Sequence, residues 1–110
     1  MENLEIIEDK INHIKDAILK YVPAKYIYLF GSFAYGEPTD DSDIDVYAVV
    51  PDEVEFNNFI WADIQTDLFN KDILNVDLFI NPESKFNYRK TRSLFEEVII
   101  NKGKLIYEFS

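Results

Sequence analysis

Apolar residues recur every three or four positions along the first part of the chain, which is the period of an α-helix with one buried face. The positions are Leu4, Ile7, Ile11, Ile14, Ile18 and Tyr21. They predict an amphipathic helix over residues 3–21, and Pro23 predicts its end. The stripe covers fewer than three heptads, which favours a face packed on a core over a coiled-coil seam.

Shorter apolar runs further along the chain have the length and composition of β-strands. They predict strands over residues 26–30, 43–50 and 75–80, and the alternation after Gly103 predicts a short last strand over 104–109. Successive strand side chains point to opposite faces. In the second strand, the pattern predicts one face with Ile44, Val46, Ala48 and Val50 and another with Asp43, Asp45, Tyr47 and Val49.

The segment after the second strand predicts a second helix. Pro51-Asp52 indicates a turn that leads into a helix over residues 53–69. Its large aromatic side chains are expected in the core, with stacking on a nucleotide base as the alternative. These aromatic residues are Phe59, Trp61 and Phe69.

The last third of the chain predicts one further helix. Asn81-Pro82 is expected to end the third strand, and a helix is expected over residues 83–101. Residues 31–42 contain two glycines and a proline and predict a loop, with a short helical turn at Ser32–Tyr35. Helices and strands that alternate in this way predict a layered α/β, or α+β, domain.

Composition narrows the class of protein. The chain has 110 residues, 47% of them apolar and 15% aromatic, which predicts one domain over residues 1–110 with a core and argues against disorder. No apolar run approaches the roughly 20 residues of a membrane span. The chain has no cysteine, so it has neither a disulfide framework nor a thiolate metal site. With an acidic N-terminus unlike a signal peptide, a cytoplasmic protein is the simplest interpretation.

The formal net charge of −10 argues against general binding to DNA or RNA, because phosphate binding needs a basic surface. It fits a protein that holds nucleotides through metal ions, one that docks on a basic partner, or a solubility-tuned surface. One basic cluster stands out, and it could balance nucleotide phosphates, contact a partner or lie in solvent. The cluster consists of Lys85, Arg89, Lys90 and Arg92. The single histidine, His13, is expected at the surface.

The strongest chemical signal lies where the first two strands are expected to meet their loop. Gly31-Ser32 ends the first strand, and after ten residues Asp43-Ile44-Asp45 opens the second. Two carboxylates two residues apart on a strand share a face and would repel each other without a cation. A glycine-serine turn offers backbone N–H groups and a hydroxyl to phosphates. An EF-hand calcium loop is excluded because Val46 stands where that motif needs glycine.

A third carboxylate and a serine complete the candidate site. Asp77 is the only charged residue in the apolar run 76–80, where a carboxylate is costly unless paired or metal-bound. It is expected beside Asp45 as a metal ligand and general base; a strand-end aspartate on an exposed edge is the alternative. Ser42 is expected to cap or brace the aspartate pair and to help bind nucleotide.

This arrangement resembles the polymerase beta-type nucleotidyltransferase superfamily, whose pattern is Gly-Ser, ten residues and Asp-x-Asp. The chain is similar to the minimal nucleotidyltransferase (MNT) proteins, many of which are antitoxins paired with a HEPN-domain toxin. The resemblance implies a small mixed β-sheet flanked by helices, with Asp43, Asp45 and Asp77 as catalytic and metal-binding residues. It implies nucleotide binding by Gly31, Ser32 and Ser42. Mg²⁺, with two ions expected, would be the cofactor and ATP the substrate.

The resemblance further implies that AMP is transferred to a tyrosine of a HEPN toxin. Three alternatives are open: an antitoxin that acts by binding alone, a small-molecule nucleotidyltransferase of the aminoglycoside-modifying type, and a subunit of a larger transferase. A HEPN partner and a nucleoside triphosphate are expected, nucleic acid and membrane are not, and a homo-oligomer is left open. The sequence does not determine the base preference, the number of AMP groups transferred or the stoichiometry.

Overall fold

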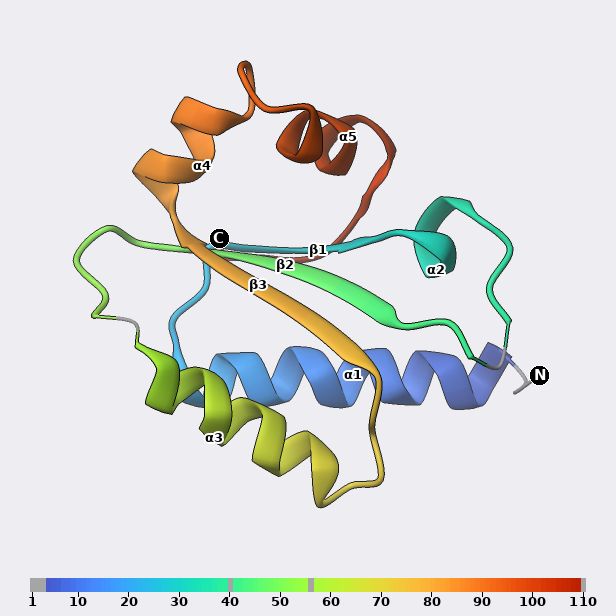
Figure 1. Cartoon of the computed structure of the whole chain (residues 1–110). Coiled ribbons are helices and arrows are strands. Elements are labelled where there is room, and N and C mark those ends of the chain that lie inside the picture. Colours follow the sequence, from blue (N-terminus) through green and yellow to red (C-terminus); the bar gives the residue numbers. More distant parts are fainter. Residues whose placement is uncertain (1–3, 40, 56, 110) are drawn as a thin grey trace.

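A computed structural model describes residues 4–39, 41–55 and 57–109 of the chain. These residues form a four-stranded sheet with the strand order β3-β2-β1-β4 (Figure 1). The strands are β1 (Tyr26–Phe30), β2 (Ile44–Val50), β3 (Val76–Pro82) and β4 (Lys104–Glu108). β2 and β3 are parallel, whereas β1 is antiparallel to both β2 and β4. The predicted layered α/β class with a mixed sheet is confirmed.

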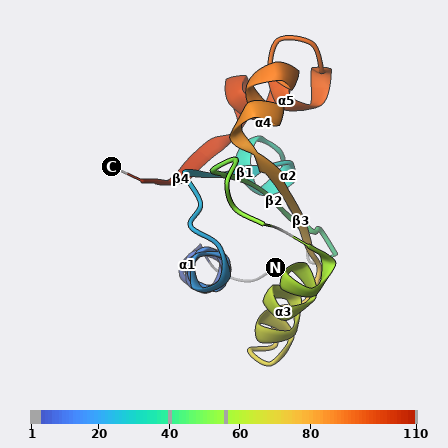
Figure 2. The same ribbon diagram turned by 90° about the vertical axis from the view of Figure 1, so that its left-hand side faces the viewer.

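Helices lie on both sides of this sheet (Figures 1 and 2). They are α1 (Leu4–Tyr21), α2 (Ser32–Tyr35), α3 (Asn58–Phe69), α4 (Glu83–Arg89) and α5 (Leu94–Lys102). α1 and α3 cover one face of the sheet, and α4 and α5 lie over the other. The predicted first helix is therefore confirmed over its described residues, and so is the short helical turn after Gly31.

The two faces of β2 are those that its alternation predicts. Ile44, Val46, Ala48 and Val50 pack in one core under α1 and α3, with Ile14, Ile18 and Ile64 among their neighbours. Tyr47 and Val49 pack in a second cluster with Phe86 of α4 and Ile99 of α5. Each strand residue therefore contributes to the core on the side to which its position in the alternation assigns it.

The predicted helix over residues 83–101 is wrong, because the chain forms two helices there. α4 ends at Arg89, and the N–H of Ser93 donates to the Arg89 carbonyl oxygen at 2.7 Å to close the turn. Glu96, on α5, is 1% exposed. A buried carboxylate needs a partner, and the turn supplies one, since the Arg89 Nε donates to the Glu96 Oε2 at 2.8 Å.

Two predicted boundaries also shift. The middle helix begins at Asn58 and not near residue 53, because the Asn57 side chain caps it by accepting the N–H groups of Phe59 and Ile60. The third strand was expected to end before Asn81-Pro82 but continues through Pro82. A proline is tolerated there because β3 is an edge strand, where no ladder bond is lost on the open side.

The aromatic residues of the middle helix do not lie in the core, contrary to the sequence prediction. Phe59 is 82% exposed, and Phe69 is also largely exposed. Only Ile64 and Leu68 of α3 are buried. Trp61 lies along the open edge of β3, where its Nε1 donates to the Leu78 carbonyl oxygen at 3.2 Å. The side chain thus satisfies an edge carbonyl that would otherwise be available to another strand.

Over the described ranges, none of the helices combines the length and the apolar character that crossing a membrane requires.

Candidate active site

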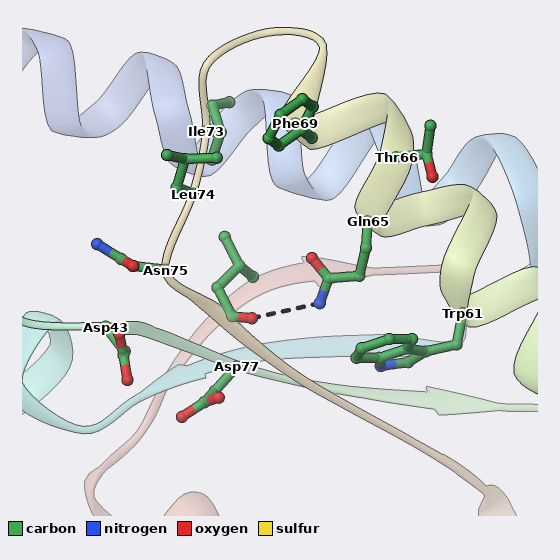
Figure 3. Close-up of a pocket in the computed structure, with 10 residues that line it drawn as sticks. Asp43, Trp61, Gln65, Thr66, Phe69, Ile73, Leu74, Asn75 and Asp77 are labelled. Carbon is green, nitrogen blue, oxygen red and sulfur yellow. Dashed lines mark hydrogen bonds between the residues drawn. The ribbon is translucent and has the colours of Figure 1, made fainter.

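Two of the candidate carboxylates are direct neighbours in the sheet. Asp45 on β2 pairs with Asp77 on β3 in the parallel register, and adjacent strands lie about 4.8 Å apart. Asp43 precedes β2 by one residue, and its charge also acts on Asp45. Figure 3 shows Asp43 and Asp77 pointing away from α3, toward the other face of the sheet. The structure therefore places the three aspartates that the sequence singles out near the beginnings of two neighbouring strands.

Asp45 is the electrostatic centre of this group. Its burial, followed by the charge of Asp77 beside it and that of Asp43, raises the pKa of Asp45 from the ordinary 3.8 to about 6. Asp45 is partly buried, whereas Asp43 and Asp77 are exposed. A cation placed among these carboxylates would offset both the cost of burial and the repulsion that raise this pKa.

The glycine of the Gly-Ser pair lies against the same carboxylate. Gly31 has φ 74°, a backbone conformation that residues other than glycine adopt only with strain. A Cβ atom at Gly31 would collide with the Asp45 Oδ2. Phe30, the preceding residue, pairs with Asp45 across β1 and β2. The glycine is therefore needed both for the turn and for the close approach of the turn to the aspartate.

The two serines have different surroundings. Ser32 opens α2, and its N–H and that of Phe33 lie at the start of a helix, where helices leave N–H groups without intrahelical partners. Ser42 lies at the far end of the loop, where its Oγ accepts the N–H of Thr39 at 2.8 Å. Its own N–H donates to the Thr39 carbonyl oxygen at 3.0 Å. Ser42 therefore closes a turn directly before the aspartates.

The donor set fits a hard divalent cation chemically, although it is not preassembled. In the part of the chain that the structure describes, no three His, Cys, Asp or Glu side chains converge as a metal site. Carboxylate oxygens are the ligands that Mg²⁺ prefers. Asp43 and Asp77 are exposed, so rotamer changes can bring their oxygens toward an ion beside Asp45. These three residues could hold a metal.

Two arginines of the basic cluster have partners within the chain. Arg89 uses its Nε on Glu96 and its Nη2 on the Oγ of Ser93, at 2.8 and 3.1 Å. Arg92 donates to the Tyr88 carbonyl oxygen at 2.7 Å and lies over the Tyr88 ring. Arg89 therefore anchors α5 to α4, a role that the spacing of basic residues alone does not indicate.

A polar network that the sequence does not indicate lies on the same face of β2 as Asp45. The Tyr47 hydroxyl donates to the Glu96 Oε2 at 2.9 Å and accepts from the Asn81 Nδ2 at 2.9 Å. Burial alone would raise the pKa of Glu96, but hydrogen bonds from Arg89, Ser93 and Tyr47 hold it below its usual range. The only sequence signal was a tyrosine at an inward position of β2, two residues after Asp45.

A pocket of about 530 Å³ lies between α3 and the beginning of β3 (Figure 3). Trp61 and Gln65 of α3 line it, and the Gln65 Nε2 donates to the Val76 carbonyl oxygen at 3.3 Å. Asp43 and Asp77 also line it, but neither Asp45 nor the Gly31-Ser32 turn does. The pocket therefore adjoins the carboxylates from the side of α3.

Fold and site together define a nucleotidyltransferase. Residues 12–110 match the family described as Polymerase beta, Nucleotidyltransferase, and the chain belongs to this family. A Methanocaldococcus jannaschii protein named "Putative protein adenylyltransferase MJ0604" is 30% identical over 107 residues, which are 97% of this chain and 100% of that protein. The family suggested by the Gly-Ser and Asp-x-Asp pattern is therefore confirmed.

Solved structures share the fold. A toxin–antitoxin with AMP-PNP has a chain with a TM-score of 0.65 and 24% identity, covering 90% of this chain and 73% of that one. The complex of a tri-AMPylated Shewanella oneidensis HEPN toxin with an MNT antitoxin has a chain with a TM-score of 0.61 and 21% identity, covering 93% and 72%. At these identities the likeness establishes the fold.

Proposed function

We propose that this protein is a magnesium-dependent adenylyltransferase that moves AMP from ATP to a hydroxyl group of a partner protein. The observation that carries the proposal is the meeting of Asp45, Asp77 and the Gly31 turn at one point of the sheet. Nucleotidyl transfer needs carboxylates for cations beside backbone donors for phosphates. Membership of a nucleotidyltransferase family supports the reaction class.

Each site residue has a proposed role. Asp43, Asp45 and Asp77 would hold two Mg²⁺ ions, which when bound neutralise phosphate charge. The Gly31-Ser32 turn donates backbone and hydroxyl hydrogen bonds to the outer phosphates. Ser42 holds the loop that connects the turn to the aspartates and so contributes to nucleotide binding through its position.

The transfer itself makes one bond and breaks one. The acceptor oxygen bonds to the α-phosphorus, while the bond from that phosphorus to the oxygen bridging to the β-phosphate breaks. Pyrophosphate leaves, and the hydroxyl proton passes to the carboxylate of Asp77, which also orients the hydroxyl. Positioning of the two reactants then supplies much of the rate enhancement.

The proposed acceptor is a tyrosine of a HEPN-domain toxin. The M. jannaschii relative is named a protein adenylyltransferase, and one structural neighbour is a complex with a HEPN toxin that carries AMP groups. The charge of −10 supports a protein acceptor over a nucleic acid. The protein would then act as the antitoxin of a toxin–antitoxin pair.

The position of a radioactive label in ATP tests this proposal. The protein is mixed with a HEPN-domain protein as the candidate partner, Mg²⁺ and ATP labelled at the α-phosphate or the γ-phosphate. We expect only the α-label on the partner, because pyrophosphate carries the γ-phosphate away. Asp77→Asn should keep the complex intact and lower the transfer strongly, since the acceptor hydroxyl loses its orienting carboxylate.

The other outcomes separate the alternatives. Transfer of the γ-label would make the protein a kinase. Neutralisation of the toxin without any transfer would indicate an antitoxin that acts by binding. Transfer to an aminoglycoside but not to the partner would indicate a small-molecule enzyme.

A further inference from the structure

Three phenylalanine rings pack together next to the carboxylates, and two of them, Phe79 and Phe95, are open to solvent. We call this surface, made of Phe30, Phe79 and Phe95, the aromatic platform. The ring centroids of Phe79 and Phe95 are 5.2 Å apart, and those of Phe30 and Phe95 are 5.4 Å apart, both edge to face. Phe30 and Phe79 are separated by 5.9 Å. β1, β3 and α5 each contribute one ring, so the platform bridges the sheet and the helix above it.

Two of the rings are only half covered. Phe79 is 41% exposed and Phe95 is 38% exposed, whereas Tyr47, which contacts Phe95 in the same cluster, is fully buried. Packing in the cluster therefore holds part of each ring and leaves part of it in solvent. An exposed aromatic ring in a fixed position can stack on a planar ligand.

The platform continues the row of site residues on the same face of the sheet. Phe79 lies two residues after Asp77 on β3, which places it on the same face about 7 Å further along. Phe30 pairs with Asp45 and directly precedes Gly31. The carboxylates, the phosphate-binding turn and the platform thus adjoin one another.

A buried network fixes the part of α5 that carries the platform. Glu96, next to Phe95, is held by Tyr47 of β2 and by Arg89 of α4. Its other oxygen, Oε1, is buried and has no hydrogen-bond partner within the described structure. A buried carboxylate that is only half satisfied costs stability. Its benefit here is a fixed position for Phe95 relative to Asp45.

We propose that the aromatic platform stacks the base of the nucleotide, an inference that rests on the proposed function. A nucleotide whose phosphates lie at the Gly31-Ser32 turn carries its base on a short tether, within reach of the adjoining rings. An acceptor on a separate molecule has no such tether. Stacking tolerates different bases because every base has a π-face, so ATP and GTP are expected to bind alike.

The pocket beside α3 is the competing place for the base. It offers the indole of Trp61, yet the Nε1 of that ring is already bonded to the Leu78 carbonyl oxygen. Asp77 points away from α3 (Figure 3), and Gly31, Ser32 and Asp45 do not line the pocket. A base in this pocket would therefore lie beside Asp43 and Asp77, which also line it, but without contact to the phosphate-binding turn.

Binding measurements with and without a base test the inference. The ligands are inorganic tripolyphosphate and an ATP analogue with a methylene group between the α- and β-phosphates, both with Mg²⁺. We expect Phe95→Ala and Phe79→Ala each to weaken binding of the analogue about tenfold and to leave binding of tripolyphosphate unchanged. Phe95→Trp should restore binding because it restores the stacking surface. Phe59→Ala is the matched control, since Phe59 is an exposed phenylalanine on α3.

The remaining outcomes decide against one proposal or the other. Failure of the wild-type protein to bind either ligand would refute the proposed function. Equal binding of the analogue by wild type, Phe95→Ala and Phe79→Ala would refute the platform alone. Weaker binding in Trp61→Ala but not in Phe95→Ala would place the base beside α3. If Phe95→Ala and Phe79→Ala leave the affinity for the analogue unchanged but raise the KM for the partner protein, the platform contacts the acceptor and not the base.

Discussion

The two faces of the sheet differ in the kind of residues that cover them and in how far they are closed to solvent. Under α1 and α3, one side is packed with aliphatic residues such as Ile18, Val46 and Ile64, none of which is exposed. On the other side, aromatic rings lie under two short helices, which are joined by an ion pair between half-exposed Arg89 and buried Glu96. A closed aliphatic face stabilises the fold, and a half-open polar face leaves room for a ligand.

This comparison predicts that substitutions on the two faces separate stability from activity. Ile64→Ala should lower the free energy of unfolding by about 2–5 kcal/mol, because it leaves a cavity in the closed core. It should leave transfer per folded molecule unchanged. The double variant Asp43→Asn with Asp45→Asn should reduce transfer by about 100-fold or more, since metal-assisted charge stabilisation is lost.

The double variant should also stay folded, because removal of like charges relieves repulsion. Urea unfolding and transfer assays on the same samples measure both quantities. In the wild type, Mg²⁺ with ATP should raise the melting temperature, and the double variant should largely lose that rise. An equal rise in both proteins would show that the aspartates do not bind the metal–nucleotide complex.

The polar network on the open face can be broken separately. Arg89→Ala should cost about 3 kcal/mol, because it leaves the buried carboxylate of Glu96 without its charged partner. Arg92→Ala, which removes an exposed arginine three residues away, should cost less than about 1 kcal/mol. Equilibrium unfolding by urea compares the two. Similar losses in both variants would mean that the Arg89–Glu96 pair does not anchor α5.

The sequence was informative where one local rule decides the structure. The alternation in β2 predicted both of its faces correctly, and the Gly-Ser and Asp-x-Asp spacing identified the residues that meet at the site. It failed where long-range contacts decide. A glutamate on a helix is usually exposed, and Glu96 is buried only because Arg89 and Tyr47 donate hydrogen bonds to it. A tryptophan on an apolar helix is expected in the core, but Trp61 covers the open edge of β3. That β3 is an edge strand becomes evident only from the strand order.

A smaller effect is expected at the phosphate-binding turn. Ser32→Ala should weaken binding of ATP with Mg²⁺ by about 1 kcal/mol, through the loss of one hydroxyl contact to a charged phosphate. Ser32→Gln should weaken it further by filling the phosphate space. Calorimetric titration measures both, with Ser84→Ala as a serine control, because Ser84 is exposed on α4 and its hydrogen bond to Asp52 uses the backbone N–H. If neither Ser32 variant changes the affinity, the turn is only structural.

The smallest effect is a pH dependence of stability that originates at Asp45. Its pKa is about 6 in the folded protein against an ordinary 3.8, so between these values the folded state binds more protons than the unfolded state. The free energy of unfolding therefore falls as the pH rises through this window and levels off above it. Because Asp45 is only partly buried, solvent screening reduces the expected change to about 1 kcal/mol.

Glu96 has a lowered pKa, so its effect on the pH dependence of stability has the opposite sign. Its contribution to the free energy of unfolding is lost only as the pH falls below the ordinary pKa of 4.5. Urea unfolding from pH 5 to 7.5 therefore isolates Asp45. Asp45→Asn should flatten the pH dependence and be the more stable protein at pH 7.5. Saturating Mg²⁺ with ATP should flatten it in the wild type as well, because bound cations favour the ionised carboxylate. If the free energy of unfolding changes with pH in the same way in wild type and Asp45→Asn, Asp45 is not the origin of the pH dependence.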